Sequence, residues 1–326
     1  QLTVFLYKRM IKIIISASRR TDIPTYYSEW FFNRIKKGYV CVRNPINIHR
    51  ISKIPLSPDV VDGIVFWTKN PIPMMNRLHE LSDYMYCFQF TVNSYGMDVE
   101  KNIPSKGGVI IPAFRELSRR IGSERVIWRY DPILLTPKYD IAYHTHYFNK
   151  MAEMLSGYTE KCIISFVDSY RNTEGSVKRL SLLPLGAQEM LELAERFAEI
   201  ADKNHLKLES CAEKIDLEQF GIAHGHCIDS GLFERLLGQR LDLKKDTNQR
   251  KECGCAASID IGMYSTCQNG CRYCYANRSI NTVLKNTAAH DPLSPLISGN
   301  IQPDDDVITR EVKSCRQRQL NFFDIK

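Results

Sequence analysis

The sequence predicts an α/β protein whose parallel strands close into a (β/α) barrel of the TIM type, with a cysteine-rich region late in the chain. Short apolar runs alternate with helical segments, which is typical of βαβ units and a parallel sheet. About seven such runs occur, close to the eight strands of a closed barrel. Each run also ends in polar or charged residues, as strands do where they reach a functional rim.

The first half of the chain sets up this alternation. An apolar strand at 12–17 is followed by a polar loop at 18–24 and a helix at 25–37. Segments 39–43 and 51–55 are expected to pair as a small hairpin. The pattern then predicts strands at 60–67, 86–92 and 126–130, with helices near 74–81 and 112–121.

The second half continues the pattern and then changes character. Helices are expected at 141–155 and 186–203, with strands at 162–167 and 206–209. Between 216 and 257 the pattern is irregular apart from a helix at 230–237, and a last strand is expected at 258–264. We therefore divide the chain into an extension at 1–9, the main part of the barrel at 10–210, a cysteine-rich segment at 211–277 and a tail packed on the barrel at 278–326.

Composition excludes few functions. Hydrophobic and charged contents of 44% and 25% are ordinary for a globular protein, and 326 residues suffice for one large barrel. The net charge of +7 permits an anionic partner, but the basic residues are dispersed. No apolar run reaches the roughly 18 residues of a membrane span. With Met10 as the expected start and no signal-peptide pattern, we expect a cytoplasmic protein without a membrane partner.

Eleven cysteines in such a chain indicate metal or redox use rather than disulfides. The early ones, Cys41, Cys87 and Cys162, lie in apolar runs and are expected to be buried free thiols. Three late ones share one short loop and are predicted metal ligands: Cys267, Cys271 and Cys274. Thiolates are soft ligands, and three of them in one loop can hold an iron–sulfur cluster while leaving one iron open.

A second set of cysteines offers four more thiolates, at Cys211, Cys227, Cys253 and Cys255. Four thiolates are enough for a second iron–sulfur cluster or a tetrahedral zinc ion. The alternative, in which Cys211 and Cys227 are plain buried thiols and the Cys-Gly-Cys segment is a turn, stays open.

The polar strand ends supply candidate binding and catalytic residues. Arg129 and Asp131 are the strongest, because an Arg–Asp pair at a strand end can bind a carboxylate, a ribose hydroxyl or a phosphate. Asp168 follows the next strand. Their alternative interpretation is as loop caps and surface charges. The remaining rim candidates are Arg19, Arg20, Asp22 and Lys69.

The cysteine loop, with Tyr273 directly before its last cysteine, resembles the signature of radical S-adenosylmethionine (SAM) enzymes. The resemblance implies a [4Fe–4S] cluster whose open iron binds SAM, a 5′-deoxyadenosyl radical, and a reductant such as ferredoxin or flavodoxin. In that superfamily the loop follows the first barrel strand, so the late position here implies a circularly permuted barrel. The rim candidates and Tyr273 would then bind SAM or substrate, with Arg129, Asp131 and Asp168 as catalytic candidates. The usual Gly-Gly-Glu-type segment is missing, and Asp22 is expected to accept the SAM amino group instead.

Three further motifs extend the resemblance over most of the chain: SRRTDIP at 18–24, FWTKNP at 66–71 and WRYDP at 128–132. Together with the cysteines they resemble an uncharacterised bacterial and archaeal family, a domain of unknown function, with a more distant likeness to the spore photoproduct lyase group. We therefore predict a radical SAM-like enzyme acting on a small molecule or a nucleic acid. The alternative is a non-catalytic zinc or iron–sulfur protein that binds nucleic acid.

Overall fold

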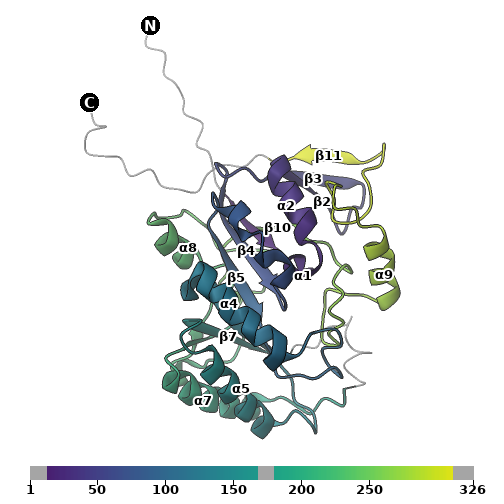
Figure 1. The fold of residues 1–326 in the computed structure, drawn as a ribbon. Coiled ribbons are helices and arrows are strands. Elements are labelled where there is room, and N and C mark those ends of the chain that lie inside the picture. Colours follow the sequence, from purple (N-terminus) through teal and green to yellow (C-terminus); the bar gives the residue numbers. More distant parts are fainter. Residues whose placement is uncertain (1–12, 168–179, 311–326) are drawn as a thin grey trace, which may run out of the picture.

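The computed structural model describes residues 13–167 and 180–310, which build a large parallel sheet flanked by helices (Figure 1). Its eight strands lie in the order β10-β1-β4-β5-β6-β7-β8-β9, and every neighbouring pair is parallel. The strands are β1 (Ile13–Ala17), β4 (Val61–Thr68), β5 (Tyr86–Thr91), β6 (Val126–Ile133), β7 (Lys161–Phe166), β8 (Lys207–Ser210), β9 (Ala223–His224) and β10 (Ile259–Asp260). The predicted parallel α/β architecture is confirmed.

In a closed barrel the two edge strands of the sheet, β9 and β10, would pair with each other. Within the described ranges no ladder joins β9 to β10, so closure into a barrel stays a prediction. At one edge β10 pairs with β1, through Ile15 with Ile259 and Ser16 with Asp260. The last strand of the sheet in sequence thus lies beside the first.

Strand β10 is much shorter than the predicted 258–264, because Asp260 turns the chain. Its carboxylate accepts hydrogen bonds from the hydroxyls of Ser16 and Ser18 and from the backbone N–H groups of Arg19 and Gly262. A Cβ atom at Gly262 would lie 2.1 Å from the Ser18 hydroxyl oxygen, so only glycine allows this close approach. The chain leaves the sheet here and enters the cysteine loop.

One face of the sheet is covered by helices. These are α2 (Ser28–Lys37), α4 (Ile111–Ile121), α5 (Ile141–Leu155) and α7 (Ala187–Lys203). Their apolar residues join one core with alternate strand residues such as Phe66, Phe88 and Trp128. Trp128 stacks on Phe148 with ring centroids 4.9 Å apart, and Phe148 stacks on Phe197 at 4.0 Å. The apolar residues whose helical spacing predicted these elements are therefore the ones that pack against the sheet.

The other face is covered by the segment at 227–256, for which the sequence predicted an irregular chain apart from a helix at 230–237, and that helix is confirmed. Its helix α8 (Ser230–Leu237) places Leu232 and Phe233 in a second core with the strand residues Ile14, Val65 and Ile127. Gly63 in β4 lies directly beneath the Phe233 ring, where a Cβ atom would be 2.3 Å from a ring carbon. The segment is therefore an inner cover of the sheet, and we call residues 227–256 the inner cover.

Gly63→Ala is expected to destabilise the protein by about 1–3 kcal/mol, because the added methyl group overpacks against Phe233. Denaturant unfolding measures the change. The control Gly107→Ala adds a methyl group where no atom lies within 4 Å. In the double variant Gly63→Ala/Phe233→Leu the two costs should be less than additive, and strict additivity would contradict the contact.

A small second sheet lies beside the first helices (Figure 1). Strands β2 (Tyr39–Arg43) and β3 (Arg50–Pro55) form the predicted antiparallel hairpin, and β11 (Asp306–Thr309) adds to it in parallel. The described tail also contains α9 (Ile280–Ala288) and packs on α2, where the Trp30 indole N–H donates to the Ser294 carbonyl at 2.9 Å. Sequence analysis missed both α9 and β11.

The remaining elements are short. The predicted helix at 25–37 is split at Tyr27 into α1 (Ile23–Tyr26) and α2, and the one at 74–81 into α3 (Ile72–Met75) and a 3₁₀ turn, η1 (Leu78–Leu81). The others are the π-helical turn η2 (Lys106–Ile110) and the 3₁₀ turns η3 (Ser123–Arg125) and η4 (Glu218–Phe220).

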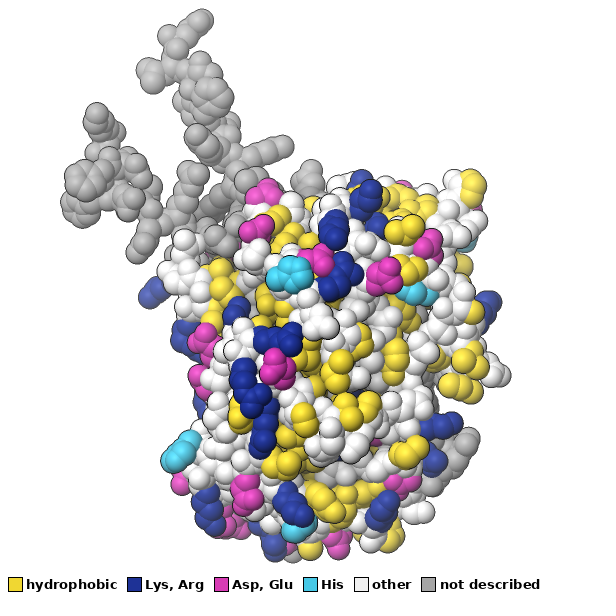
Figure 2. All heavy atoms as spheres, viewed as in Figure 1, with side chains coloured by type: hydrophobic (Ala, Val, Ile, Leu, Met, Phe, Trp, Pro, Cys, Tyr) yellow, Lys and Arg dark blue, Asp and Glu magenta, His cyan; other side chains and the backbone are white. Residues whose placement is uncertain are grey.

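Among the helices of the described ranges, none combines the length and apolarity needed to cross a membrane. On the face shown in Figure 2, Lys and Arg side chains are interspersed with Asp and Glu. This view shows no single basic patch of the kind that nucleic-acid binding favours.

Candidate functional site

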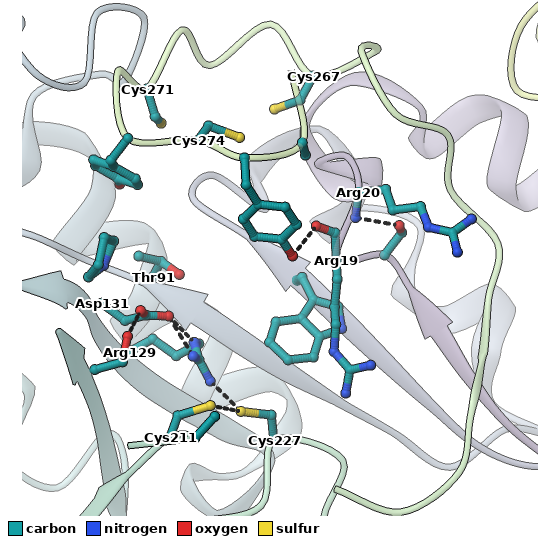
Figure 3. Close-up of a pocket in the computed structure, with 18 of the residues that line it drawn as sticks. Arg19, Arg20, Thr91, Arg129, Asp131, Cys211, Cys227, Cys267, Cys271 and Cys274 are labelled. Atoms are coloured by element: carbon teal, nitrogen blue, oxygen red, sulfur yellow. Dashed lines mark hydrogen bonds and ion pairs between the residues drawn. The ribbon is translucent and has the colours of Figure 1, made fainter. Parts of the chain in front are cut away.

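A cavity of about 580 Å³ opens where the parallel strands end (Figure 3). Every predicted site residue within the described ranges lines it, and Asp168 lies outside those ranges. The rim residues are Arg19, Arg20, Asp22, Lys69, Arg129, Asp131 and Tyr273, and the cysteines are Cys211, Cys227, Cys253, Cys255, Cys267, Cys271 and Cys274. The structure thus brings both cysteine sets to one cavity. For the cysteine loop this was expected, because the loop follows a strand whose end shares one edge of the sheet with the other strand ends, but the sequence did not predict it for the second set.

The cysteine loop is held by backbone contacts with the segment after β5. Glu100 and Cys271 form an isolated β-bridge, and the Arg272 N–H donates to the Val99 carbonyl at 2.9 Å. Gly270, directly before Cys271 in the loop, has a φ of 67°, a left-handed conformation that glycine adopts easily. These contacts fix the loop before any ligand binds to it.

Helix α1 supports the same loop from the other side. The Tyr27 hydroxyl donates to the Thr266 carbonyl at 2.6 Å, and the Tyr26 hydroxyl donates to the Asn269 side chain at 2.9 Å. Asn269 in turn donates to Asp22 at 3.1 Å. The loop is therefore anchored to α1 and to the residues that cap its two ends, as well as to the segment after β5.

Of the three thiols of this loop, that of Cys267 is buried and those of Cys271 and Cys274 are partly buried. Burial raises the pKa of Cys271 to about 12, although the nearby charge of Lys69 lowers it in part. Burial also raises the pKa values of Cys267 and Cys274. Without a metal these groups are neutral thiols at pH 7, and a bound cation would be needed to deprotonate them.

A buried carboxylate that sequence analysis missed organises the wall beneath the loop. Glu100 is 1% exposed and accepts hydrogen bonds from Lys69 at 2.7 Å, from Asn93 at 3.2 Å, and from Lys106 and Tyr273. Burial would raise its pKa, but the charges of Lys69 and Lys106 outweigh burial and bring the pKa to about 2. Glu100 is thus an ionised hub that holds Lys69 and Tyr273 in place.

Asp22 serves the internal architecture. Its two carboxylate oxygens accept from the backbone N–H groups of Thr25 and Lys69, at 3.1 and 2.8 Å, from the Thr68 hydroxyl at 2.8 Å and from the Asn269 amide at 3.1 Å. Burial raises its pKa, and these hydrogen bonds lower it in part. Asp22 therefore ties the start of α1, the end of β4 and the cysteine loop together, while its expected contact with SAM stays a prediction.

On the opposite side of the cavity two arginines lie near one indole. The guanidinium carbons of Arg19 and Arg129 are 5.1 and 5.2 Å from the Trp67 ring centroid, within cation–π range. Trp67 is itself oriented by its N–H, which donates to the Ser16 hydroxyl at 3.1 Å. The sequence singled out Trp67 only as part of a motif.

Arg129 is 4% exposed and forms the predicted pair with Asp131, through its Nε at 3.0 Å. Burial would raise the pKa of Asp131, but the Arg129 charge and the Ser165 hydrogen bond lower it. Another nitrogen, Nη1, donates to the Cys227 sulfur at 2.8 Å (Figure 3). This arginine therefore links the rim to the second cysteine set.

The four cysteines of the second set come together from three segments. Cys211 directly follows β8, Cys227 begins the inner cover, and Cys253 and Cys255 lie near its end. The sulfurs of Cys211 and Cys227 are 3.0 Å apart, and Cys255 lies close enough to Cys227 and Cys253 to influence the pKa values of both. The set is thus a continuous row of thiols along one wall.

Arg20 lies at the mouth of the cavity. Its guanidinium carbon is 5.0 Å from the Tyr264 ring centroid and its Nε is 3.9 Å from Asp260. It is more exposed than Arg129, so of the two it is the residue that an entering ligand would meet first.

Comparison with known proteins gives a family and no activity. No curated protein matches the chain. Among solved structures, a candidate alpha-L-fucosidase from Bacteroides thetaiotaomicron shares 10% identity over 67% of this chain and 81% of its own, with a TM-score of 0.25. That score is too low to support any argument about fold or function. The model of one family, the domain of unknown function DUF1848, matches residues 14–276, and the chain belongs to that family.

Proposed function

We propose that the protein is an iron–sulfur enzyme of the radical SAM type, with a cluster held by Cys267, Cys271 and Cys274. The observation that carries the proposal is that these thiols and the polar strand ends line the same cavity. A cofactor bound at the loop would therefore face side chains able to bind a substrate.

The spacing of the three sulfurs supports a cluster over a single ion. Among the described His, Cys, Asp and Glu residues, only His49, Asp304 and Asp305 bring three ligand atoms within 4.8 Å of one another. At least one pair of the loop sulfurs is thus more than 4.8 Å apart, wider than the ~3.8 Å that separates thiolates on one zinc ion with ~2.3 Å bonds. In a cubane each thiolate binds a different iron, so a wider spacing fits.

When bound, such a cluster would hold SAM at its open iron and, given an electron from a ferredoxin- or flavodoxin-type reductant, supply a 5′-deoxyadenosyl radical. The chain would support this chemistry electrostatically. Lys69, fixed by Glu100, places a positive charge beside Cys271 and so favours its thiolate. The free state of all described cysteines fits the reducing cytoplasm that such a centre needs.

Arg19 and Arg129 supply the proposed substrate site. The Nη2 atom of Arg19 is buried and has no hydrogen-bond partner among the described residues. A buried donor of this kind is costly unless a ligand satisfies it. We therefore propose a substrate with a carboxylate or phosphate group, either a small molecule or part of a nucleic acid, with Arg129, Asp131 and Asp168 as catalytic candidates.

The position of the loop supports a permuted barrel as part of this proposal. Strand β10 precedes the loop and lies beside β1, so it takes the first place in the sheet despite its late place in the sequence. Closure of the sheet between β9 and β10 would complete the barrel.

The direct test is SAM cleavage by anaerobically reconstituted protein with dithionite as reductant. We expect 5′-deoxyadenosine from the wild type and none from Cys271→Ala. Cys41→Ala is the control, because Cys41 is a buried thiol of the small sheet, away from the cavity. A reduced cluster whose EPR signal ignores SAM, with no 5′-deoxyadenosine formed, would contradict the proposal and favour the non-catalytic alternative.

A further inference from the structure

We infer that Cys211, Cys227, Cys253 and Cys255 form a second metal centre, which binds a single soft divalent ion of the zinc class rather than a cluster. This inference does not depend on SAM chemistry. It rests on the row of four thiols described above, which closes one wall of the cavity.

The spacing within the row favours one ion. Thiolates on a zinc ion lie about 3.8 Å apart, so the Cys211 and Cys227 sulfurs, now 3.0 Å apart, need to separate by only about 0.8 Å. A cubane would push them farther apart, since each thiolate binds its own iron. The ends of the row must draw inward, because no three of these sulfurs lie mutually within 4.8 Å in the described structure.

The surroundings suit four thiolates. A divalent ion with four thiolates carries a net charge of −2, and the two guanidinium groups of Arg19 and Arg129 lie on this wall. Arg129 Nη1 already donates to the Cys227 sulfur at 2.8 Å, and the Ile228 N–H donates to Cys255 at 3.4 Å. Donors of this kind, outside the ligand shell, orient and stabilise metal-bound thiolates.

The turn between the last two ligands is built for close packing. A Cβ atom at Gly254 would lie 2.6 Å from the His226 ring nitrogen Nε2. A glycine at this position lets Cys253 and Cys255 approach Cys227, which is the next residue after that histidine. The glycine of the short Cys-Gly-Cys segment is therefore required by the His226 ring that packs against it.

Four protein ligands would leave no open coordination position, so the ion would be structural. It would connect the end of β8 to both ends of the inner cover, which packs on the sheet through Leu232 and Phe233. Binding of the ion would thus hold the inner cover in place and fix the cavity wall that carries Arg129.

The test counts metal in the full-length chain, purified without added metal. We expect about one zinc per wild-type chain, with zinc falling below about a tenth of that level in Cys227→Ala and Cys255→Ala. The iron bound after anaerobic reconstitution should persist in those variants and be lost in Cys271→Ala, which should keep its zinc. Loss of iron and sulfide instead of zinc in Cys227→Ala, or unchanged zinc, would overturn the inference. Absence of iron from every variant would defeat only the proposed function.

A second measurement avoids variants of the site that fail to fold. In the Cys271→Ala background, cobalt should replace the zinc and give the visible spectrum of tetrahedral thiolate coordination. Chelation should then speed tryptic cleavage within the inner cover, where Lys244, Lys245, Arg250 and Lys251 are exposed. A cobalt-loaded protein without that spectrum, or cleavage that ignores chelation, would overturn the inference.

Discussion

Glu100→Gln is expected to lower the free energy of unfolding by about 3–5 kcal/mol, the loss typical of breaking a buried ion pair. The glutamine keeps the shape of the side chain but removes the charge that faces Lys69 and Lys106. Both lysines are largely buried, so each would be left as an uncompensated cation. Denaturant unfolding at pH 7 measures the loss.

Glu116→Gln is the matched control. Glu116 also lies between two cations, Arg119 and Arg120, but on the exposed surface of α4. We expect no measurable change in its unfolding midpoint, because solvent screens exposed pairs. Equal effects of the two substitutions would show that burial of Glu100 contributes nothing.

The pH dependence of stability gives an independent signature of Glu100. The pKa of its carboxyl is about 2 in the folded protein, below its ordinary value of 4.5, so its stabilisation is complete above about pH 4.5 and is lost as the pH falls toward 2. The loss should reach about 3 kcal/mol. The stability of Glu100→Gln should fall less over the same range, and parallel curves for the two proteins would contradict this assignment.

Asp131→Asn is expected to cost a similar 3–5 kcal/mol, because it leaves the Arg129 guanidinium, whose side chain is 5% exposed, without its carboxylate partner. The hydrogen bond from Ser165 and the cation near Cys227 would both be disturbed. Unfolding of the purified protein, with its metal content measured in parallel, separates a loss of stability from a loss of ligand.

Asp98→Asn provides the comparison for that variant. Asp98 also pairs with a cation, Lys138, at 3.0 Å, but both side chains are about half exposed. Its substitution should cost less than about 1 kcal/mol. If Asp131→Asn cost no more than Asp98→Asn, the Arg129–Asp131 pair would be only a surface feature, as its alternative interpretation holds.

Local patterns in the sequence were enough to predict the parallel sheet and its helices. The apolar runs that became β4, β5 and β7 are buried on both faces, and such strands show as continuous hydrophobic stretches. The two-residue strand β9 has no such pattern, and β11 is exposed along its length, so neither was predictable from hydrophobicity.

The site was predictable where its residues stand at strand ends or in a spaced motif. Arg129 and the spaced Cys267, Cys271 and Cys274 met that condition, whereas the second cysteine set was selected by counting thiols, and all of these residues line the cavity. Glu100 did not, because it is one glutamate in a loop and its partners Lys69 and Tyr273 are distant in sequence. The role of the inner cover was hidden for a similar reason, since only the tertiary contact of Phe233 with Gly63 reveals it.

The pairing of β10 with β1 has a consequence for how the protein is made. Strand β1 can pair with β10 only after the ribosome has made the residues near 260, so the sheet gains its outer strand late in synthesis. Until synthesis passes that point, β1 is an unpaired edge, a kind of surface that invites wrong partners. The cysteine loop follows β10 directly, so its geometry is completed among the last steps of folding. A metal could therefore bind to that loop in its final geometry only after the whole sheet has assembled.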